Sequence, residues 1–193
     1  MEQVLKGGWS TSASWGDLNR DGCPDLVVVH YADWSFDNDP ICPGPAPHPR
    51  DVCPPRRFRG LRDQVFLSDG QGSFHEAGPE VGFDSTGKGI GLAISDVDLD
   101  GDLDIYVTND TDPNGLYRNT GQGQFEEVGL ISGVAVGADG NADGSMGVDV
   151  GDLTGDGLPD IWVTNFERET FALYQNVGDC SFQHVSRLAG ISS

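Results

Sequence analysis

Three short segments of the chain carry oxygen-bearing side chains at alternating positions, an arrangement that can surround a hard metal cation. Each follows the pattern D-x-[DNT]-x-D-G-x-x-D, so positions 1, 3, 5 and 9 offer side-chain oxygens and position 7 offers a backbone carbonyl. The glycine at position 6 can take a positive φ, which lets the loop wrap around an ion. Calcium prefers such oxygen ligands, so we expect about three Ca²⁺ ions, one in each segment.

The predicted ligands have the same spacing in all three segments. They are Asp17, Asn19, Asp21, the carbonyl of Cys23 and Asp25 in the first loop; Asp96, Asp98, Asp100, the carbonyl of Asp102 and Asp104 in the second; and Asp152, Thr154, Asp156, the carbonyl of Leu158 and Asp160 in the third. The carboxylate of Asp102 is expected to face water. Thr154 offers a neutral hydroxyl where the other loops have Asn19 and Asp98, so we expect weaker binding in the third loop.

The same spacing opens an EF-hand loop, but an EF-hand needs a glutamate at position 12 and an exiting helix. Position 12 here is Val28, Val107 or Val163, each inside an apolar run typical of a strand. A solvated, Asp-rich turn would explain one such loop. Three copies in register favour metal binding.

The acidic loops belong to a repeat that covers most of the chain. Residues 12–31, 91–110 and 147–166 align without gaps, and each is followed by a second shared unit that closes on a phenylalanine. The separation between the first aspartate and that phenylalanine is 57 residues in the first repeat and 29 and 30 in the others. The first repeat therefore holds an insertion, at 33–59, which is rich in proline.

Each repeat predicts four short antiparallel strands, because apolar and polar residues alternate between Gly, Asn and Asp turns. No segment shows a helical period beyond one turn. Four strands recurring about every 50 residues are typical of a β-propeller blade, so we expect an all-β fold with three blades of four antiparallel strands. The strands of the second repeat are expected at about 90–95, 103–109, 115–119 and 124–129. The blades are expected at about 7–83, 88–131 and 145–190, as one repeat domain over 1–193.

Three blades are fewer than a closed propeller normally needs. The chain is therefore expected to be part of a longer propeller, or to have its open faces and edges covered by other copies. A β-sandwich built from the same strands is the alternative fold.

The composition excludes several classes of partner. Asp and Glu number 31 against 11 Lys and Arg, a formal charge of -20, which argues against binding to nucleic acid or to an anionic membrane. The chain nowhere has 18 consecutive apolar residues, so membrane insertion is not expected. The histidines are scattered, no nucleophile lies beside a base in the sequence, and we expect no enzymatic activity.

The repeats resemble the FG-GAP/VCBS family, which includes integrin α-subunit propellers, and are most similar to its cartilage-acidic-protein (ASPIC/UnbV-associated) type. The resemblance is carried by residues 53–74, 87–128 and 144–166. It implies a β-propeller that binds calcium between the first two strands of a blade, outside the cell or at its surface. It also implies a disulfide between Cys42 and Cys53 in the insertion. The sequence departs from the family pattern in two ways. Family members usually carry about seven blades, and this type normally adds a C-terminal ASPIC/UnbV domain, which is not found here.

Together these patterns predict a noncatalytic, calcium-binding extracellular module for adhesion or assembly. Its partners would be other proteins or copies of itself, with glycan as a further class. Two alternatives stay open: a self-assembling subunit of an extracellular fibril or polymer, and a portion of a secreted polysaccharide-acting enzyme on a propeller scaffold.

Overall fold

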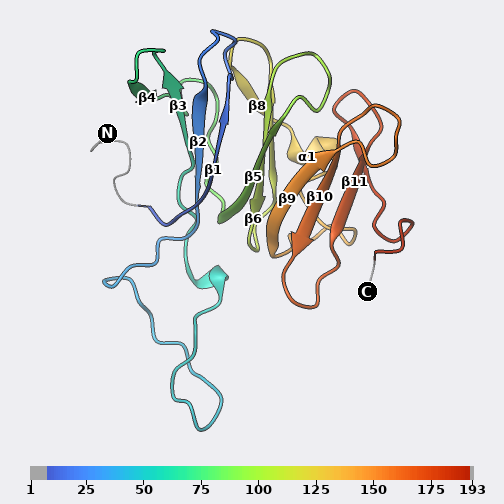
Figure 1. Ribbon diagram of the computed structural model, residues 1–193. Coiled ribbons are helices and arrows are strands. Elements are labelled where there is room, and N and C mark those ends of the chain that lie inside the picture. The colour runs from blue at the N-terminus through green and yellow to red at the C-terminus, as the bar shows by residue number, and fades with distance from the viewer. Residues whose placement is uncertain (1–7, 192–193) are drawn as a thin grey trace.

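In the computed structural model, which describes residues 8–191, the strands form three four-stranded antiparallel sheets that stand side by side (Figure 1). Strands follow one another in chain order within each sheet. The first sheet contains β1 (Ser10–Gly16), β2 (Asp25–His30), β3 (Gln64–Ser68) and β4 (Phe74–Glu76). The second contains β5 (Gly89–Ser95), β6 (Asp104–Asn109), β7 (Gly115–Asn119) and β8 (Phe125–Glu127). The third contains β9 (Ser145–Gly151), β10 (Asp160–Asn165), β11 (Ala172–Asn176) and β12 (Phe182–His184).

The all-β fold with four antiparallel strands in each repeat is confirmed, and we refer to the three sheets as the first, second and third blade. In the part of the chain that the structure describes, helix is limited to a 3₁₀ turn, η1 (Pro55–Arg57), and a single-turn helix, α1 (Gly129–Ser132). Within residues 8–191, no helix is long and apolar enough to cross a membrane. The expected start of the first blade near residue 7 lies outside the described residues.

The central blade is buried on both faces because a neighbouring blade packs against each. In β6, Ile105 and Val107 point into the core shared with the first blade, where they meet Val27. Tyr106, between them, points into the core shared with the third blade, where it meets Ile161. This alternation follows from the two-residue period of a strand. It explains why β6 is apolar on both faces.

A hydrogen bond repeated between blades joins the first and second acidic loops to the blade that follows each. The Nδ2 of Asn119, the last residue of β7, donates to the carbonyl of Leu18 at 2.8 Å. The Nδ2 of Asn176, the last residue of β11, donates to the carbonyl of Val97 at 2.8 Å. Both amides are buried. The first blade has Ser68 at the corresponding place, so it lacks this donor.

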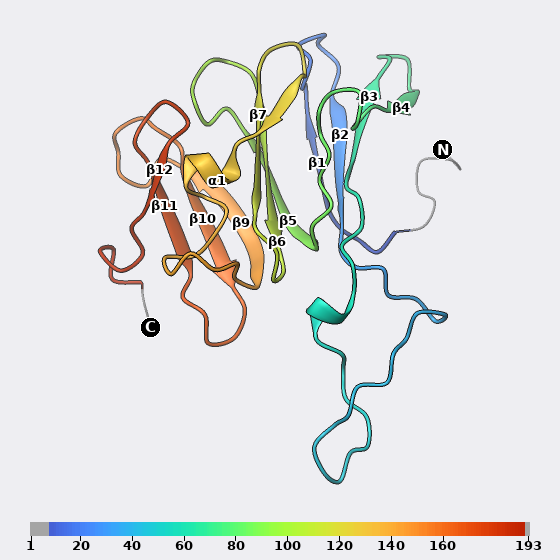
Figure 2. The ribbon, with the colours of Figure 1, turned by 180° about the vertical axis from the view of Figure 1, so that it is seen from behind.

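The insertion leaves the first blade after β2 and lies beyond the end of the sheets opposite the acidic loops (Figure 2). Its base is closed where the backbone N–H of Asp33 donates to Arg59 O at 3.0 Å. Further out, Cys42 and Cys53 form the disulfide that the family resemblance implies, with Cα atoms 5.3 Å apart. A Pro-rich loop with little core of its own is restrained in this way.

We expect the buried amide of Asn119 to be a sensitive point between the first two blades. Asn119→Ala removes donors to Leu18 O and Leu103 O and leaves both carbonyls unpaired. The free energy of unfolding should therefore fall by about 1–3 kcal/mol. Denaturant unfolding measures this, with Asn141→Ala in an exposed turn as the control that should change stability by less than about 0.5 kcal/mol. Equal effects of the two substitutions would contradict the role given to Asn119.

A second buried polar group, Asp63, predicts how stability depends on pH. Its Oδ1 accepts the backbone N–H of His30 at 2.7 Å, and Ser85 Oγ donates to its other oxygen. Burial raises the pKa of Asp63 to about 7, although both hydrogen bonds oppose the shift. The folded state therefore keeps a proton that the unfolded state releases above pH 4. Stability from this group is present below that pH and is lost as the pH rises through about 7.

The wild type should lose roughly 2–4 kcal/mol of unfolding free energy through this group between pH 4 and 7. Asp63→Asn should remove that loss. The readout is the difference between wild type and variant in unfolding free energy, measured in calcium-free buffer. Asp104 and Asp143, whose pKa values burial also raises, keep part of the slope in the variant. Asp84→Asn, at an exposed site, is the matched control. A variant slope equal to that of the wild type would show that Asp63 is ionised throughout.

Candidate metal centre

The three acidic loops lie at the same end of the three blades, each between the first and second strand (Figure 1). Every hairpin closes in the same register: the residue before position 1 pairs with position 9. The closing pairs are Gly16 with Asp25, Ser95 with Asp104, and Gly151 with Asp160. Repeated sequence therefore produces repeated loop geometry.

The aspartate at position 1 holds the turn of each loop from inside. One oxygen accepts the backbone N–H of position 5 at 3.1–3.2 Å, and the other accepts that of position 6 at 2.9–3.0 Å. The glycine at position 6 has a positive φ in every loop, as the sequence predicted, with values of 86°, 91° and 88°. Position 4 is also left-handed, and two of its residues, Arg20 and Leu99, are not glycine.

The aspartate at position 9 is buried and bridges the loop to the third strand. One oxygen accepts the N–H of position 2 at 2.9 Å, and the other accepts the N–H of the last residue of the third strand at 2.8–2.9 Å. The three residues are Asp25, Asp104 and Asp160. A carboxylate oxygen has a second lone pair, so these bonds leave each group able to bind a cation. The spacing pattern marked this residue as a ligand and missed its structural role.

The second loop gathers its carboxylates most closely. Oxygens of Asp96, Asp98 and Asp104 lie within 4.8 Å of one another. Calcium–oxygen distances are about 2.3–2.6 Å, so two ligands on opposite sides of one ion are about 5 Å apart. The donor set and its spacing therefore fit calcium. Asp100 is outside this group, and its Oδ1 accepts the N–H of Asp102 at 2.8 Å.

The other two loops share the scaffold but are arranged differently at position 3. In the first loop, Asn19 Nδ2 donates to Asp21 Oδ2 at 3.2 Å, while Asp17 holds the turn. In the third loop the side chains from Asp152 to Asp156 are exposed. The carbonyl residues Cys23 and Leu158 are partly buried. Among the described residues, three carboxylates come within 4.8 Å of one another in the second loop alone, and this loop is also the most enclosed.

Burial raises the pKa values of several aspartates in these loops. It raises the pKa of Asp104 to about 7, against the stabilising N–H groups of Asn119 and Val97, and the charges of Asp98 and Asp100 add to the rise. Burial also raises the pKa of Asp98 and of Asp25. A bound divalent cation reverses this effect because it favours the ionised carboxylates.

A basic residue of the first loop reaches the second loop. Nε of Arg20 lies 2.9 Å from Oδ1 of Asp102 and donates to the carbonyl of Gly101 at 3.1 Å. The contact with Asp102 is an ion pair rather than an aligned hydrogen bond. The expectation that the Asp102 carboxylate faces water is wrong, since this residue is only 8% exposed. Arg20 and Asp102 meet because neighbouring blades place their loops side by side.

Comparison with known families agrees with this geometry. A model of the FG-GAP-like repeat matches residues 96–163, which begin at the first predicted ligand of the second loop and end in β10. This part of the chain is therefore similar to FG-GAP repeats, which are propeller blades. No curated protein matches the chain. With three four-stranded antiparallel sheets, the class is a propeller-type repeat protein.

Proposed function

We propose that this chain is a noncatalytic, calcium-binding repeat module that acts outside the cell in adhesion or protein assembly. The observation that carries the proposal is the group of carboxylate oxygens from Asp96, Asp98 and Asp104, within 4.8 Å of one another on a loop scaffold that recurs in all three blades. Calcium would be held in each loop by the ligands predicted from the sequence. It would supply positive charge to a chain with a formal charge of -20.

An extracellular location is supported by the disulfide and by the family type. The Cys42–Cys53 bridge lies in an exposed, Pro-rich insertion, and such bridges persist in oxidising compartments. The resemblance to the cartilage-acidic-protein type favours the same location. Calcium in that environment is millimolar, which suits loops of modest affinity.

A noncatalytic role is supported by the state of the nucleophiles and bases. Ser186 Oγ lies 3.5 Å from His184 Nε2, the kind of pair that activates a serine. Ser186 is fully buried, however, and its hydroxyl accepts the N–H of Leu173 at 2.8 Å. The pair therefore belongs to the packing of the third blade. The aspartates of the loops have ligand and scaffold roles.

Assembly through the third blade is a second proposed role, favoured by one residue in particular. Position 2 of the first and second loops, Leu18 and Val97, is at most 2% exposed because it inserts into the core with the next blade. Leu153 has the same position in the third loop and is 59% exposed. Trp162, which corresponds in register to Tyr106, is partly exposed and contacts Phe171. This face has the features of a surface that receives another blade.

Calcium should stabilise the metal-stripped protein. A titration followed by melting temperature and calorimetry is expected to show an upward shift at millimolar calcium and about three binding sites. Asp98→Asn should remove about one site, since it weakens the second loop. Asp149→Asn, an exposed charge change outside the loops, is the matched control. Absence of any shift in the wild type would refute the calcium proposal.

Leu153→Asp tests association through the third blade. If this face receives another copy, the wild-type mass in light scattering should rise with concentration, and Leu153→Asp should suppress the rise because it places a charge in an apolar contact. Leu188→Asp, at a residue that follows β12 and is 87% exposed, should leave the rise intact. A wild-type protein that remains a monomer at all concentrations would contradict this role.

A further inference from the structure

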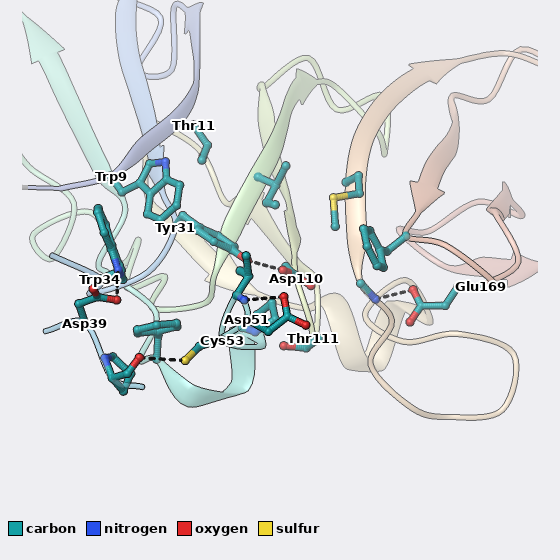
Figure 3. Close-up of a pocket in the computed structure, with 18 of the residues that line it drawn as sticks. Trp9, Thr11, Tyr31, Trp34, Asp39, Asp51, Cys53, Asp110, Thr111 and Glu169 are labelled. Atoms are coloured by element: carbon teal, nitrogen blue, oxygen red, sulfur yellow. Dashed lines mark hydrogen bonds between the residues drawn. The ribbon is translucent and has the colours of Figure 1, made fainter. Parts of the chain in front are cut away.

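A large pocket lies at the end of the blades opposite the acidic loops. It has a volume of about 1030 Å³ and is bounded by the insertion and by the first strands of all three blades (Figure 3). Thr11 of β1, Ile90 of β5 and Met146 of β9 form its inner wall. Phe58 and Pro55 of the insertion line another side. The pocket therefore exists only where the insertion and the three blades meet.

Aromatic rings form a row that begins in this pocket and continues onto the open surface. Tyr31 contacts Trp9 with ring centres 5.1 Å apart, Trp9 contacts Trp34 at 5.8 Å, and Trp34 contacts Phe36 at 5.4 Å. Trp9 and Trp34 are 48% and 38% exposed, and Phe36 is 93% exposed. Large exposed rings on a monomer mark a binding surface. Because the rings lie in a row and do not enclose one point, they suit an extended ligand better than a single cation.

Carboxylates face the same pocket and are held in place by the protein. Tyr31 Oη donates to Asp110, and Gly144 N donates to Glu169 Oε2 at 2.7 Å (Figure 3). Asp39 accepts Trp34 Nε1 at 3.3 Å and pairs with Arg50 at 2.5 Å. Each carboxylate has further lone pairs available to a ligand. The pocket thus combines apolar ring faces with fixed hydrogen-bond acceptors.

We infer that this pocket binds an oligosaccharide that carries no acidic groups. Sugar rings present apolar C–H faces that pack on aromatic rings, and their hydroxyls donate to carboxylates. The row from Tyr31 to Phe36 extends past the pocket, so more than one sugar unit is bound. Four acids line the site against one arginine, Arg50, so the excess negative charge repels uronic or sialic acids. The inference rests on the proposed adhesive function, for which it names the partner class, and it does not use the calcium loops.

Trp34 provides a direct test. The full chain is applied to an array of neutral oligosaccharides (cello-, manno- and galacto-series), chitosan oligosaccharides and acidic ones (polygalacturonate and hyaluronan). The strongest neutral or amine-bearing binder is then titrated in solution by tryptophan fluorescence and calorimetry. Trp34→Ala should weaken it roughly tenfold or more. The matched control is Trp15→Ala, which removes a 57% exposed indole from the outer face of the first blade and should leave affinity unchanged.

The outcomes separate this inference from the calcium proposal. Each titration is repeated with calcium and with a chelator, and the circular dichroism of each variant checks its fold. Binding that needs Trp34, with or without calcium, supports the pocket even if the loops bind no metal. Binding of acidic glycans alone, equal effects of Trp34→Ala and Trp15→Ala, or no glycan binding would overturn the inference. A proline-rich peptide with two arginines is titrated in parallel, and its binding in place of glycans would also overturn it.

Discussion

The structure depends most on one buried carboxylate in each blade. Asp25, Asp104 and Asp160 each accept a backbone N–H from their own loop and another from the end of the third strand. A buried charge is costly unless hydrogen bonds or an ion compensate it. The same group therefore does three things: it closes the first hairpin, ties that hairpin to the third strand, and places an oxygen at the edge of the acidic loop.

This carboxylate also explains how one blade prepares the surface for the next. The carboxylate accepts the N–H of position 2 and so fixes that residue. In the first two loops, the side chain of position 2 enters the core shared with the next blade, and its carbonyl accepts a hydrogen bond from an asparagine of that blade. Leu18 and Val97 make both contacts: their side chains lie in the shared cores, and their carbonyls accept from Asn119 and Asn176. Leu153 has the same backbone support, from Asp160, without the following blade. The aspartate at position 9 supports position 2 in the same way in all three blades, and on the third blade this position faces outward. The first blade differs, since Ser68 cannot donate as asparagine does.

Local sequence was sufficient to predict the strands, the hairpin loops and the glycine conformation at position 6. These features depend on residues close together in the chain, where alternation and turn chemistry act directly. The disulfide came from family resemblance rather than from spacing. The ion pair between Arg20 and Asp102 was not predictable, because 82 positions separate the two residues and only the packing of blades brings them together. The bridging role of Asp104 was missed for a related reason: its second donor, Asn119, belongs to another strand.

The pocket depends on residues that lie outside the repeat pattern. Thr11, Ile90 and Met146 occupy matching strands, but the residues that make this end of the molecule distinctive, Trp34 and Asp39, come from an insertion that only the first repeat has. The repeated residues predict the scaffold that the blades share, and the insertion supplies a chemically different surface. The insertion is held by its own disulfide and by contacts at its base, whereas the acidic loops are held by their buried aspartates. Coupling between two sites requires an element with two states that both sites bias. Separate supports at opposite ends of rigid strands favour independent action, with the loops securing the blades and the insertion setting what the other end can bind.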